Sequence, residues 1–300
     1  MLEMNKLNKN SINIHFDIDL ACNTRCSYCY KLDELDNTKL VNREVLDYTI
    51  AAINKLKVEK PNYKINITIL GGEPLLVVDE VIEFIKKVYS EGITIQILSN
   101  LNFDAKSPNL QKILEFYKKF PNFQIYLSWH KSCDEQQIKQ NILLFQDLLV
   151  VTFLLENNNL QEIYNDMKWL TENTNIIFGI ENIRSKNDES LFDLYDDYRY
   201  REIISKSDST DGVNIIGDTT YSNIESKKLN LLNISKQYYT ICQLSEICID
   251  WHGNIQTVCT YPYNGGHIKN GIEIIDVFCN KYSCRCITNT YKKLIKVRND

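Results

Sequence analysis

Short apolar runs alternate with amphipathic stretches along about the first 180 residues of the chain. Each apolar run has the length of a strand, and the stretches between them repeat apolar residues at i, i+3, i+4 and i+7, as amphipathic helices do. The predicted strands are residues 13–20, 64–70, 93–98, 123–127, 149–155 and 176–180. Strands that alternate with helices pair in parallel, with the helices as crossovers. We therefore predict an α/β fold whose six units are too few for a complete eight-fold barrel.

Polar residues gather where the predicted strands end. Ligands of parallel α/β sheets bind at the carboxyl ends of the strands, so these residues are candidates for a functional site. Serine and asparagine also end strands and cap helices by bonding to the backbone, which is the simpler explanation for some of them. The residues are Cys22 after the first strand, Gly71 after the second, Ser99 and Asn100 after the third, Ser128, Trp129 and His130 after the fourth, and Glu181 and Asn182 after the sixth.

Three cysteines follow the first strand at spacings typical of an iron–sulfur site. Cys22, Cys26 and Cys29 form the pattern CxxxCxxC. Three thiolates this close in sequence can ligate three irons of a [4Fe–4S] cube and leave the fourth iron open, as a catalytic metal site does. A zinc site would need a fourth cysteine or histidine nearby, and residues 31–42 contain neither. Three unrelated buried cysteines are the alternative.

This stretch resembles the signature of the radical S-adenosylmethionine (SAM) enzymes. A second feature of that family, GGEP, is present at Gly71, Gly72, Glu73 and Pro74. The resemblance covers about the first two-thirds of the chain and implies an open, partial (β/α)6 TIM-like barrel as the radical SAM core. It also implies that the three cysteines hold the SAM-binding [4Fe–4S] cluster, that the GGE segment contacts the SAM amine, and that Tyr28 lies near the adenine.

The resemblance implies further SAM contacts at the ends of the later strands. Ser99, Asn100 and Ser128 match places where relatives use a Thr/Ser-Asn pair and a serine to hold SAM. His130 departs from the acidic residue that relatives often carry there. It is a candidate for contact with the cofactor or substrate at the barrel mouth, although a lone histidine is more often structural. We interpret Cys133, which stands alone past this strand, as a small buried apolar residue.

The last 60 residues hold six more cysteines, a density that indicates a metal site. They are Cys242, Cys248, Cys259, Cys279, Cys284 and Cys286. Residues 247–250 and 254–258 are predicted to form a β-hairpin, with Cys242 before it and Cys259 after it. Cys248 lies within the first of these strands and is interpreted as structural. A zinc ribbon held by four cysteines is an alternative.

This tail resembles the auxiliary-cluster extension of radical SAM enzymes, the SPASM domain or the shorter twitch domain. The resemblance implies one auxiliary [4Fe–4S] cluster, because six thiols cannot supply the eight ligands of two cubes. Its ligands are then Cys242 and Cys259 together with two of Cys279, Cys284 and Cys286. The tail departs from the longer SPASM pattern in the spacing that leads to Cys259, which is one residue longer, and in its late cysteines.

Composition and charge set the broader limits. The predicted units are a core of residues 1–206, a polar bridge of residues 207–240 and the cysteine-rich unit of residues 241–300. A net charge of −5 without a long basic run argues against nucleic acid as a partner. The clustered spacing of the ten cysteines favours metal ligation over a secreted disulfide framework. The N-terminus lacks the apolar core of a signal peptide, and the longest apolar run, residues 142–155, is too short to span a bilayer. We expect a cytoplasmic protein without membrane association.

The resemblance also implies a reaction. Reductive cleavage of SAM would give a 5′-deoxyadenosyl radical that takes a hydrogen atom from the substrate. With the auxiliary cluster as electron acceptor, the net result is an oxidation of a peptide, by dehydrogenation or cross-linking. The electron donor would be a flavodoxin or ferredoxin. A dehydrogenase of a small molecule, such as a sugar or nucleoside, is the alternative within the family. A non-enzymatic iron–sulfur carrier or scaffold is the alternative of another class, and GGEP argues against it because a carrier needs no SAM site.

Overall fold

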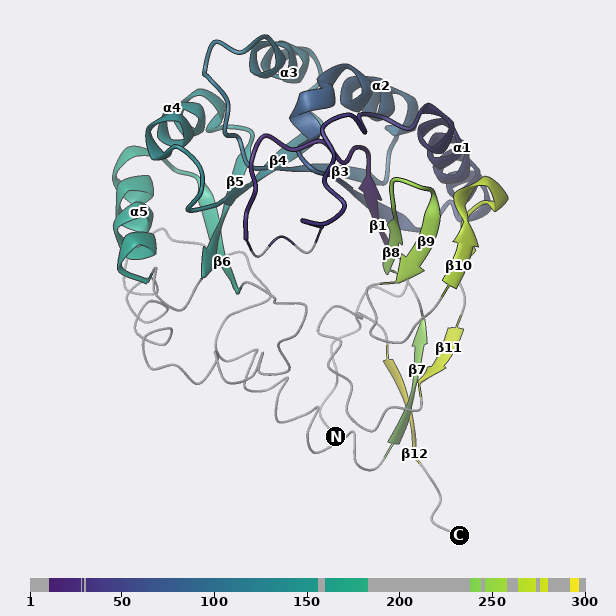
Figure 1. Ribbon diagram of the computed structural model, residues 1–300. Coiled ribbons are helices and arrows are strands. Elements are labelled where there is room, and N and C mark those ends of the chain that lie inside the picture. The colour runs from purple at the N-terminus through teal and green to yellow at the C-terminus, as the bar shows by residue number, and fades with distance from the viewer. Residues whose placement is uncertain are drawn as a thin grey trace.

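The computed structural model describes residues 11–27, 29, 31–155, 160–182, 238–243, 246–257, 264–273, 276–279 and 292–296. Within them, six parallel strands follow one another in chain order across a curved sheet (Figure 1). These strands are β1 (Ser11–Asp17), β2 (Lys64–Leu70), β3 (Ile93–Ser99), β4 (Phe123–Trp129), β5 (Leu149–Leu155) and β6 (Ile177–Asn182). The predicted α/β fold, with a parallel sheet of six strand units, is confirmed.

The first strand begins and ends earlier than residues 13–20, the range that the apolar alternation predicts. Ile18 makes the last bond of sheet type, from its N–H to the carbonyl of Leu70 at 2.9 Å. The N–H of Leu20 instead donates to the carbonyl of Lys39 within the following loop, at 3.0 Å. Ile18 and Leu20 both remain buried, so the apolar alternation continues past the point where the backbone leaves the sheet.

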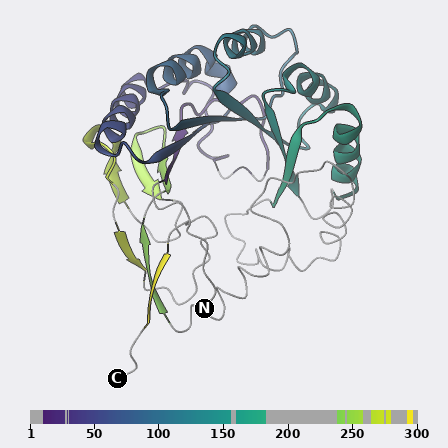
Figure 2. The same cartoon turned by 180° about the vertical axis from the view of Figure 1, so that it is seen from behind.

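The helices of the described residues cover the outer face of this sheet, as the views from the front and from behind show (Figures 1 and 2). Asn42 caps the first helix, because its side-chain oxygen accepts a bond from the N–H of Val45. Asp79 does not cap the second helix. A 3-10 turn, η1 (Pro74–Val77), runs directly into that helix and places Asp79 inside its first turn. The helices are α1 (Arg43–Glu59), α2 (Val78–Val88), α3 (Pro108–Lys119), α4 (Glu135–Phe145) and α5 (Leu160–Asn173).

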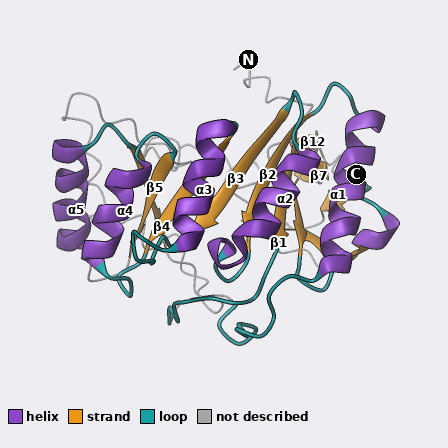
Figure 3. Cartoon of the chain, turned by 90° about the horizontal axis from the view of Figure 1, so that it is seen from above, coloured by secondary structure: helices purple, strands orange, loops and turns teal. Residues whose placement is uncertain are grey.

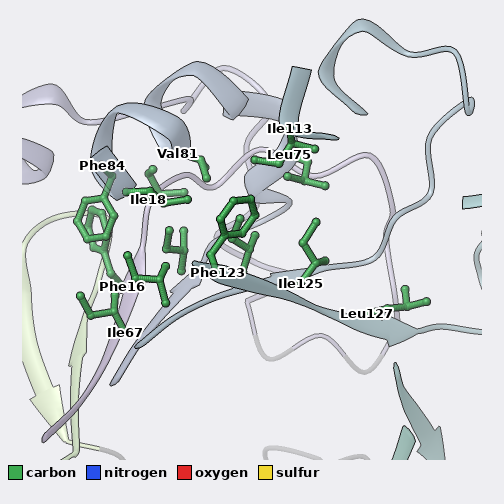
Figure 4. Packing of buried hydrophobic residues seen from close by; sticks show 14 of the residues in the cluster. Phe16, Ile18, Ile67, Leu75, Val81, Phe84, Ile113, Phe123, Ile125 and Leu127 are labelled. Atoms are coloured by element: carbon green, nitrogen blue, oxygen red, sulfur yellow. The ribbon is translucent and has the colours of Figure 1, made fainter. Parts of the chain in front are cut away.

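The hydrophobic core fills the layer between the sheet and the helices, which lie side by side in one row (Figure 3). Alternate residues of β1 to β4 enter this core, as Ile67 of β2 and Ile125 of β4 do (Figure 4). Phe16 of β1 packs against Phe84 of α2, with the ring centroids 5.4 Å apart. Burial of this apolar stripe on each helix is what fixes the helices to the sheet.

The inner face of the sheet, opposite the helices, carries polar side chains. On it the amide of Asn66 donates to Oδ1 of Asn13 at 2.8 Å, which links β2 to β1. The amide of Gln96 donates to the hydroxyl of Tyr126 at 3.2 Å, which links β3 to β4. A parallel sheet with helices on both faces has apolar side chains on both. The polar inner face therefore marks the side on which this partial barrel can receive a ligand.

The predicted C-terminal hairpin forms, and it extends the barrel sheet. β8 (Glu246–Ile249) and β9 (Asn254–Thr257) pair antiparallel, and β10 (Asn264–His267) pairs with β9. β8 also pairs in parallel with β1, with Ile249 opposite Phe16, so the sheet has nine strands in the order β10-β9-β8-β1-β2-β3-β4-β5-β6. The physical reason is the open edge of β1, which the buried Ile247 and Ile249 cover. The sequence pattern did not predict this pairing.

A second sheet of three antiparallel strands, in the order β11-β7-β12, carries two of the late cysteines. β7 (Tyr238–Gln243) contains Cys242 and β11 (Asp276–Cys279) ends at Cys279, and β12 (Lys292–Lys296) pairs with the other edge of β7. Tyr28, Cys259, Cys284, Cys286 and the bridge up to residue 237 lie outside the described residues. The boundaries of the three predicted units therefore stay a prediction. Across the described part of the chain, no helix is long and apolar enough to cross a membrane.

Candidate functional site

The loop of residues 18–42, here called the cysteine loop, connects β1 to α1 on the inner side of the curved sheet (Figure 1). Arg25 holds its first half together, because Nη1 donates to the carbonyls of Cys22 and Thr24 at 2.7 and 2.8 Å. Nη2 of Arg25 donates to Oδ1 of Asn37 at 3.0 Å, and the N–H of Cys22 donates to the same oxygen at 3.2 Å. The two halves of the loop are thus fixed to each other beside the first cysteine.

The thiols of Cys22 and Cys26 are buried and close to one hydroxyl group. Oγ1 of Thr24 lies 3.3 Å from Sγ of Cys22 and 3.8 Å from Sγ of Cys26. Cys29 is half-buried, and its N–H donates to the carbonyl of Cys26 at 3.0 Å, which turns the chain back toward the other two cysteines. Across the described side chains, no three Cys, His, Asp or Glu residues are grouped as a metal site, so the meeting of all three thiols stays a prediction.

The two buried thiols differ in their electrostatic surroundings. Burial raises the pKa of Cys22 above its usual value, and the Thr24 hydroxyl only partly offsets this. Burial also raises the pKa of Cys26, but hydrogen bonds from His130, Ser132 and Thr24 outweigh it and lower the pKa to about 7. A thiolate is the form that ligates a metal, so the lower pKa of Cys26 makes it the better prepared of the two cysteines for metal ligation.

The Gly-Gly pair of the GGEP turn lies directly against the cysteine loop. A Cβ atom on Gly71 would stand 1.9 Å from Oδ1 of Asp19, and one on Gly72 would stand 2.0 Å from the carbonyl oxygen of Ala21. The N–H of Gly72 donates to the carbonyl of Asp19 at 3.1 Å, and the N–H of Glu73 donates to the carbonyl of Ala21 at 2.7 Å. Because they lack side chains, the two glycines allow the loops after β1 and β2 to approach each other. This packing role does not depend on any contact of the glycines with a cofactor.

Glu73 ties the end of β2 to the end of β3. Its Oε1 accepts bonds from the hydroxyl of Ser99 at 2.7 Å and from the N–H of Leu75 at 3.0 Å, and its Oε2 accepts from the N–H of Asn100 at 2.8 Å. The carboxyl group is buried, and burial raises its pKa to about 7. Burial and the neighbouring charge of Glu73 likewise raise the pKa of Asp19 to about 8.

Asn100 connects the third strand end to the cysteine loop. Its Nδ2 donates to Oδ1 of Asn23 at 2.9 Å and to Oγ1 of Thr24 at 3.3 Å, and it lies 3.9 Å from Sγ of Cys22. Ser99 is occupied by Glu73 on one side and by the N–H of Leu101, at 3.0 Å, on the other. The structure thus brings Ser99 and Asn100 to the predicted site in roles that brace it.

Leu101 follows with a positive φ of 49°, which is unusual for a leucine. Its side chain is fully buried, and the amide of Asn141 in α4 donates to the carbonyls of Leu101 and Phe103 at 2.9 and 2.8 Å. Strained backbone persists only where the surroundings fix it, and Asn141 provides that fixation here. No pattern in the sequence predicts this contact between α4 and the segment after β3.

The end of β4 borders a small cavity of about 190 Å³. Trp129 stacks on Phe153 at 5.3 Å between ring centroids and forms part of its wall together with His130 and Cys133. Cys133 is half-buried and packs against the core, as predicted for a small apolar residue, and burial raises its pKa to about 12. Ser128 is buried near the end of the same strand, with Thr152 of β5 opposite it.

A larger cavity of about 950 Å³ lies between the second half of the cysteine loop and the β8–β9 hairpin. At its wall, Lys31 forms an ion pair with Asp17 of β1, and both side chains are largely buried. Burial raises the pKa of Asp17, and the Lys31 charge opposes that shift. Asp250 and Gln256 line the opposite side. Sequence spacing did not single out any of these four residues, because their meeting depends on the unexpected pairing of β8 with β1.

Comparisons with known proteins agree with this arrangement. Residues 20–120 match the model of a family described as a 4Fe-4S single cluster domain, a range that includes the three cysteines and the GGEP turn. No significant match to a curated protein was found.

Several solved structures share the fold, among them the following two. One is anSMEcpe with bound AdoMet and the Cp18Cys peptide, which is 14% identical over 87% of this chain and 78% of that chain, with a TM-score of 0.56. The other is SuiB of Streptococcus suis bound to S-adenosylmethionine, which is 14% identical over 82% of this chain and 60% of that chain, with a TM-score of 0.53. The predicted resemblance to radical SAM enzymes is confirmed in the matched iron–sulfur family and in the fold.

Proposed function

We propose that this chain is a radical SAM enzyme. The observation that carries the proposal is the loop of three cysteines at the carboxyl end of β1, braced by the GGEP turn of β2 and by Asn100 of β3. Every part of this arrangement lies at one end of a parallel sheet, where α/β enzymes place their chemistry. The match to a 4Fe-4S family and the two SAM-bound structures of the same fold support it.

The residues present fit a [4Fe–4S] cluster and SAM. Cys22, Cys26 and Cys29 would hold three irons, and the open iron would receive the methionine end of SAM. Oδ2 of Asp19 is buried at the GGEP turn with no hydrogen-bond partner among the described residues, so an unpaired polar atom remains where the SAM amine is expected. Tyr28 would lie near the adenine. When bound, the cluster supplies the electron that splits SAM into methionine and a 5′-deoxyadenosyl radical.

The chain's own residues would position the reactants. Glu73 and Asn100 hold the ends of β2 and β3 at fixed positions beside the cysteine loop. Ser128 lies near the end of β4 and His130 directly follows this strand, and both are candidate contacts for SAM. The polar inner face of the sheet would orient the substrate by hydrogen bonds while the loop keeps bulk water away.

The proposed net reaction is an oxidation of a peptide, with an auxiliary [4Fe–4S] cluster as the electron acceptor. The structure of anSMEcpe contains a peptide, which favours this substrate class over a small molecule such as a sugar or nucleoside. In the second sheet, Cys279 lies opposite Thr240, two residues from Val277, the partner of Cys242. The two cysteines therefore occupy diagonal positions on neighbouring strands, which are about 7–8 Å apart. Cys259, Cys284 and Cys286 supply the remaining candidates, and a flavodoxin or ferredoxin would supply the electron.

Anaerobic reconstitution with iron and sulfide, followed by addition of SAM and dithionite, tests the function. Wild-type protein should form 5′-deoxyadenosine, and Cys26→Ala should lose about four irons and the product, because one iron loses its protein thiolate. Cys133→Ala removes a neighbouring thiol outside the motif and should retain both. Equal product from wild type and Cys26→Ala would contradict the proposal, and iron without any product would favour a carrier.

A further inference from the structure

Cys26 receives hydrogen-bonding groups from a distant part of the chain. Oγ of Ser132, in the loop between β4 and α4, lies 3.2 Å from Sγ of Cys26, although the two residues are 106 positions apart. The imidazole of His130, in the same loop, also hydrogen-bonds this thiol. No pattern in the sequence predicts a bond from this loop to the cysteines, because Ser132 is one of many polar loop residues there.

This loop is fixed in place on both sides of Ser132. The N–H of Cys133 donates to the carbonyl of His130 at 3.1 Å and closes a turn. Asp134 then caps α4, since its Oδ1 accepts bonds from the N–H groups of Gln136 and Gln137 at 2.9 and 3.1 Å. The N–H of Asp134 donates to Oδ1 of Asn102, which follows β3. The Ser132 hydroxyl is therefore held by the fold, and its approach to Cys26 needs no rearrangement.

The two buried cysteines have different neighbours. Sγ of Cys22 faces the Thr24 hydroxyl at 3.3 Å and the Asn100 amide at a long 3.9 Å. Sγ of Cys26 shares Thr24 at 3.8 Å and has Ser132 and His130 in addition. Hydrogen bonds to the sulfurs of an iron–sulfur centre set its reduction potential, because they stabilise the extra negative charge of the reduced state.

We propose that Ser132, together with His130, is a positioning residue of the cluster that orients the Cys26 sulfur by hydrogen bonds and raises the reduction potential of the cluster. A thiolate ligand has no proton, so Ser132 would then be the donor and the sulfur the acceptor. Ser132 is itself exposed, whereas Cys26 is buried. The inference rests on the proposed function, because it needs the cluster at Cys22, Cys26 and Cys29.

The test is a redox titration of the reconstituted full chain, followed by electron paramagnetic resonance. The signal that disappears in Cys26→Ala identifies the cluster to be followed. Ser132→Ala should hold the wild-type amount of iron and shift the midpoint of this signal to a lower potential. Ser132→Thr keeps the hydroxyl and should retain the wild-type midpoint. Ser90→Ala is the matched control, since the Ser90 hydroxyl lies near the carbonyl of Glu91, far from the cysteines in the sequence and outside the site.

A second pair of variants keeps the test decisive if Ser132→Ala fails to hold iron. His130→Phe removes the other donor and should lower the midpoint, whereas His130→Gln keeps an N–H donor and should lower it less. An unchanged midpoint in iron-replete Ser132→Ala and His130→Phe would overturn the inference, whereas the proposed function would still stand if the wild-type protein forms 5′-deoxyadenosine from SAM. A wild-type protein without any iron dependent on Cys26 would overturn both.

Discussion

Gly72 shows how one residue serves the packing of two loops. The backbone of the GGEP turn approaches the cysteine loop so closely that a methyl group on Gly72 would stand 2.0 Å from the carbonyl oxygen of Ala21. Backbone cannot yield without moving the cysteine loop itself. The corresponding methyl group on Gly71 would stand 1.9 Å from the side-chain oxygen Oδ1 of Asp19 and 2.8 Å from the Asp19 carbonyl oxygen, so its nearest contact is a side-chain atom. The sequence does not distinguish these two adjacent glycines, but in the structure they differ in how well each would tolerate a larger side chain.

We therefore expect Gly72→Ala to destabilise the protein more than Gly71→Ala does. Overpacking of a closely packed site costs about 1–3 kcal/mol, and Gly72→Ala should fall within or above that range. Chemical denaturation of the two variants and the wild type, at matched iron content, measures the difference. Iron retention should fall in the same order, because the displaced backbone carries the cysteines. A stability of Gly72→Ala equal to that of the wild type would show that the two loops do not pack as described.

For single residues, the sequence predicts the motif residues of the candidate site, but it does not predict the residues that hold those motifs together. The spacing of Cys22, Cys26 and Cys29 and the GGEP motif are local patterns, so they are readable without a fold. Ser132 and Asp19 have no such pattern, since each matters only because a distant loop folds against it. Predicted contacts of Gly71, Glu73 and Ser128 with SAM remain predictions, and the braces that Glu73 and Ser99 form are what the structure adds.

Among the elements, the order and type of the six strands follow from apolar periodicity, and their ends do not. The stretch from Ile18 to Leu20 keeps the alternation of a strand because its side chains enter the core after the backbone has left the sheet. The hairpin of β8 and β9 was predicted from its own alternation and turn. The pairing of β8 with β1 was not predicted, because β1 lies more than 200 residues earlier in the chain. Only the open edge of the sheet determines that β8 pairs there.

The pairing of β8 with β1 makes the hairpin part of the barrel core, and this has a measurable consequence. Ile249 is fully buried and lies opposite Phe16 of β1. Ile249→Ala should therefore lower the free energy of unfolding of the barrel by about 2–5 kcal/mol, the usual cost of such a truncation in a core. Val58→Ala, at a position of α1 that is 81% exposed, is the control and should change little. If Ile249→Ala left the main unfolding transition unchanged, the hairpin would have to fold as a unit separate from the barrel.

For the molecule as a whole, the α/β class was predictable because strands that alternate with helices leave few topologies. The partial barrel was expected from the resemblance to radical SAM enzymes. The distribution of the late cysteines between two separate sheets was not predictable from the sequence. The nine-stranded sheet includes the hairpin that holds Cys248, whereas Cys242 and Cys279 lie on neighbouring strands of the three-stranded sheet. The late cysteines that the structure describes are therefore divided between the sheets, with Cys248 in the barrel sheet and the two candidate cluster ligands Cys242 and Cys279 in the other.

The last prediction follows from this division. If the auxiliary cluster serves the substrate step, Cys242→Ala and Cys279→Ala should each lose about four of about eight irons, the count for two cubes, yet still form 5′-deoxyadenosine from SAM. Cys248→Ala is the matched control and should keep all the iron, because Cys248 lies in β8 opposite His15 of the barrel. Iron and zinc analysis of each variant, with circular dichroism to verify folding, provides the measurement. Loss of both iron and SAM cleavage in a folded Cys242→Ala protein would mean that the two sites depend on each other. Loss of one zinc with no loss of iron would replace the auxiliary cluster by a structural zinc site, and the electron from the substrate would then need another acceptor.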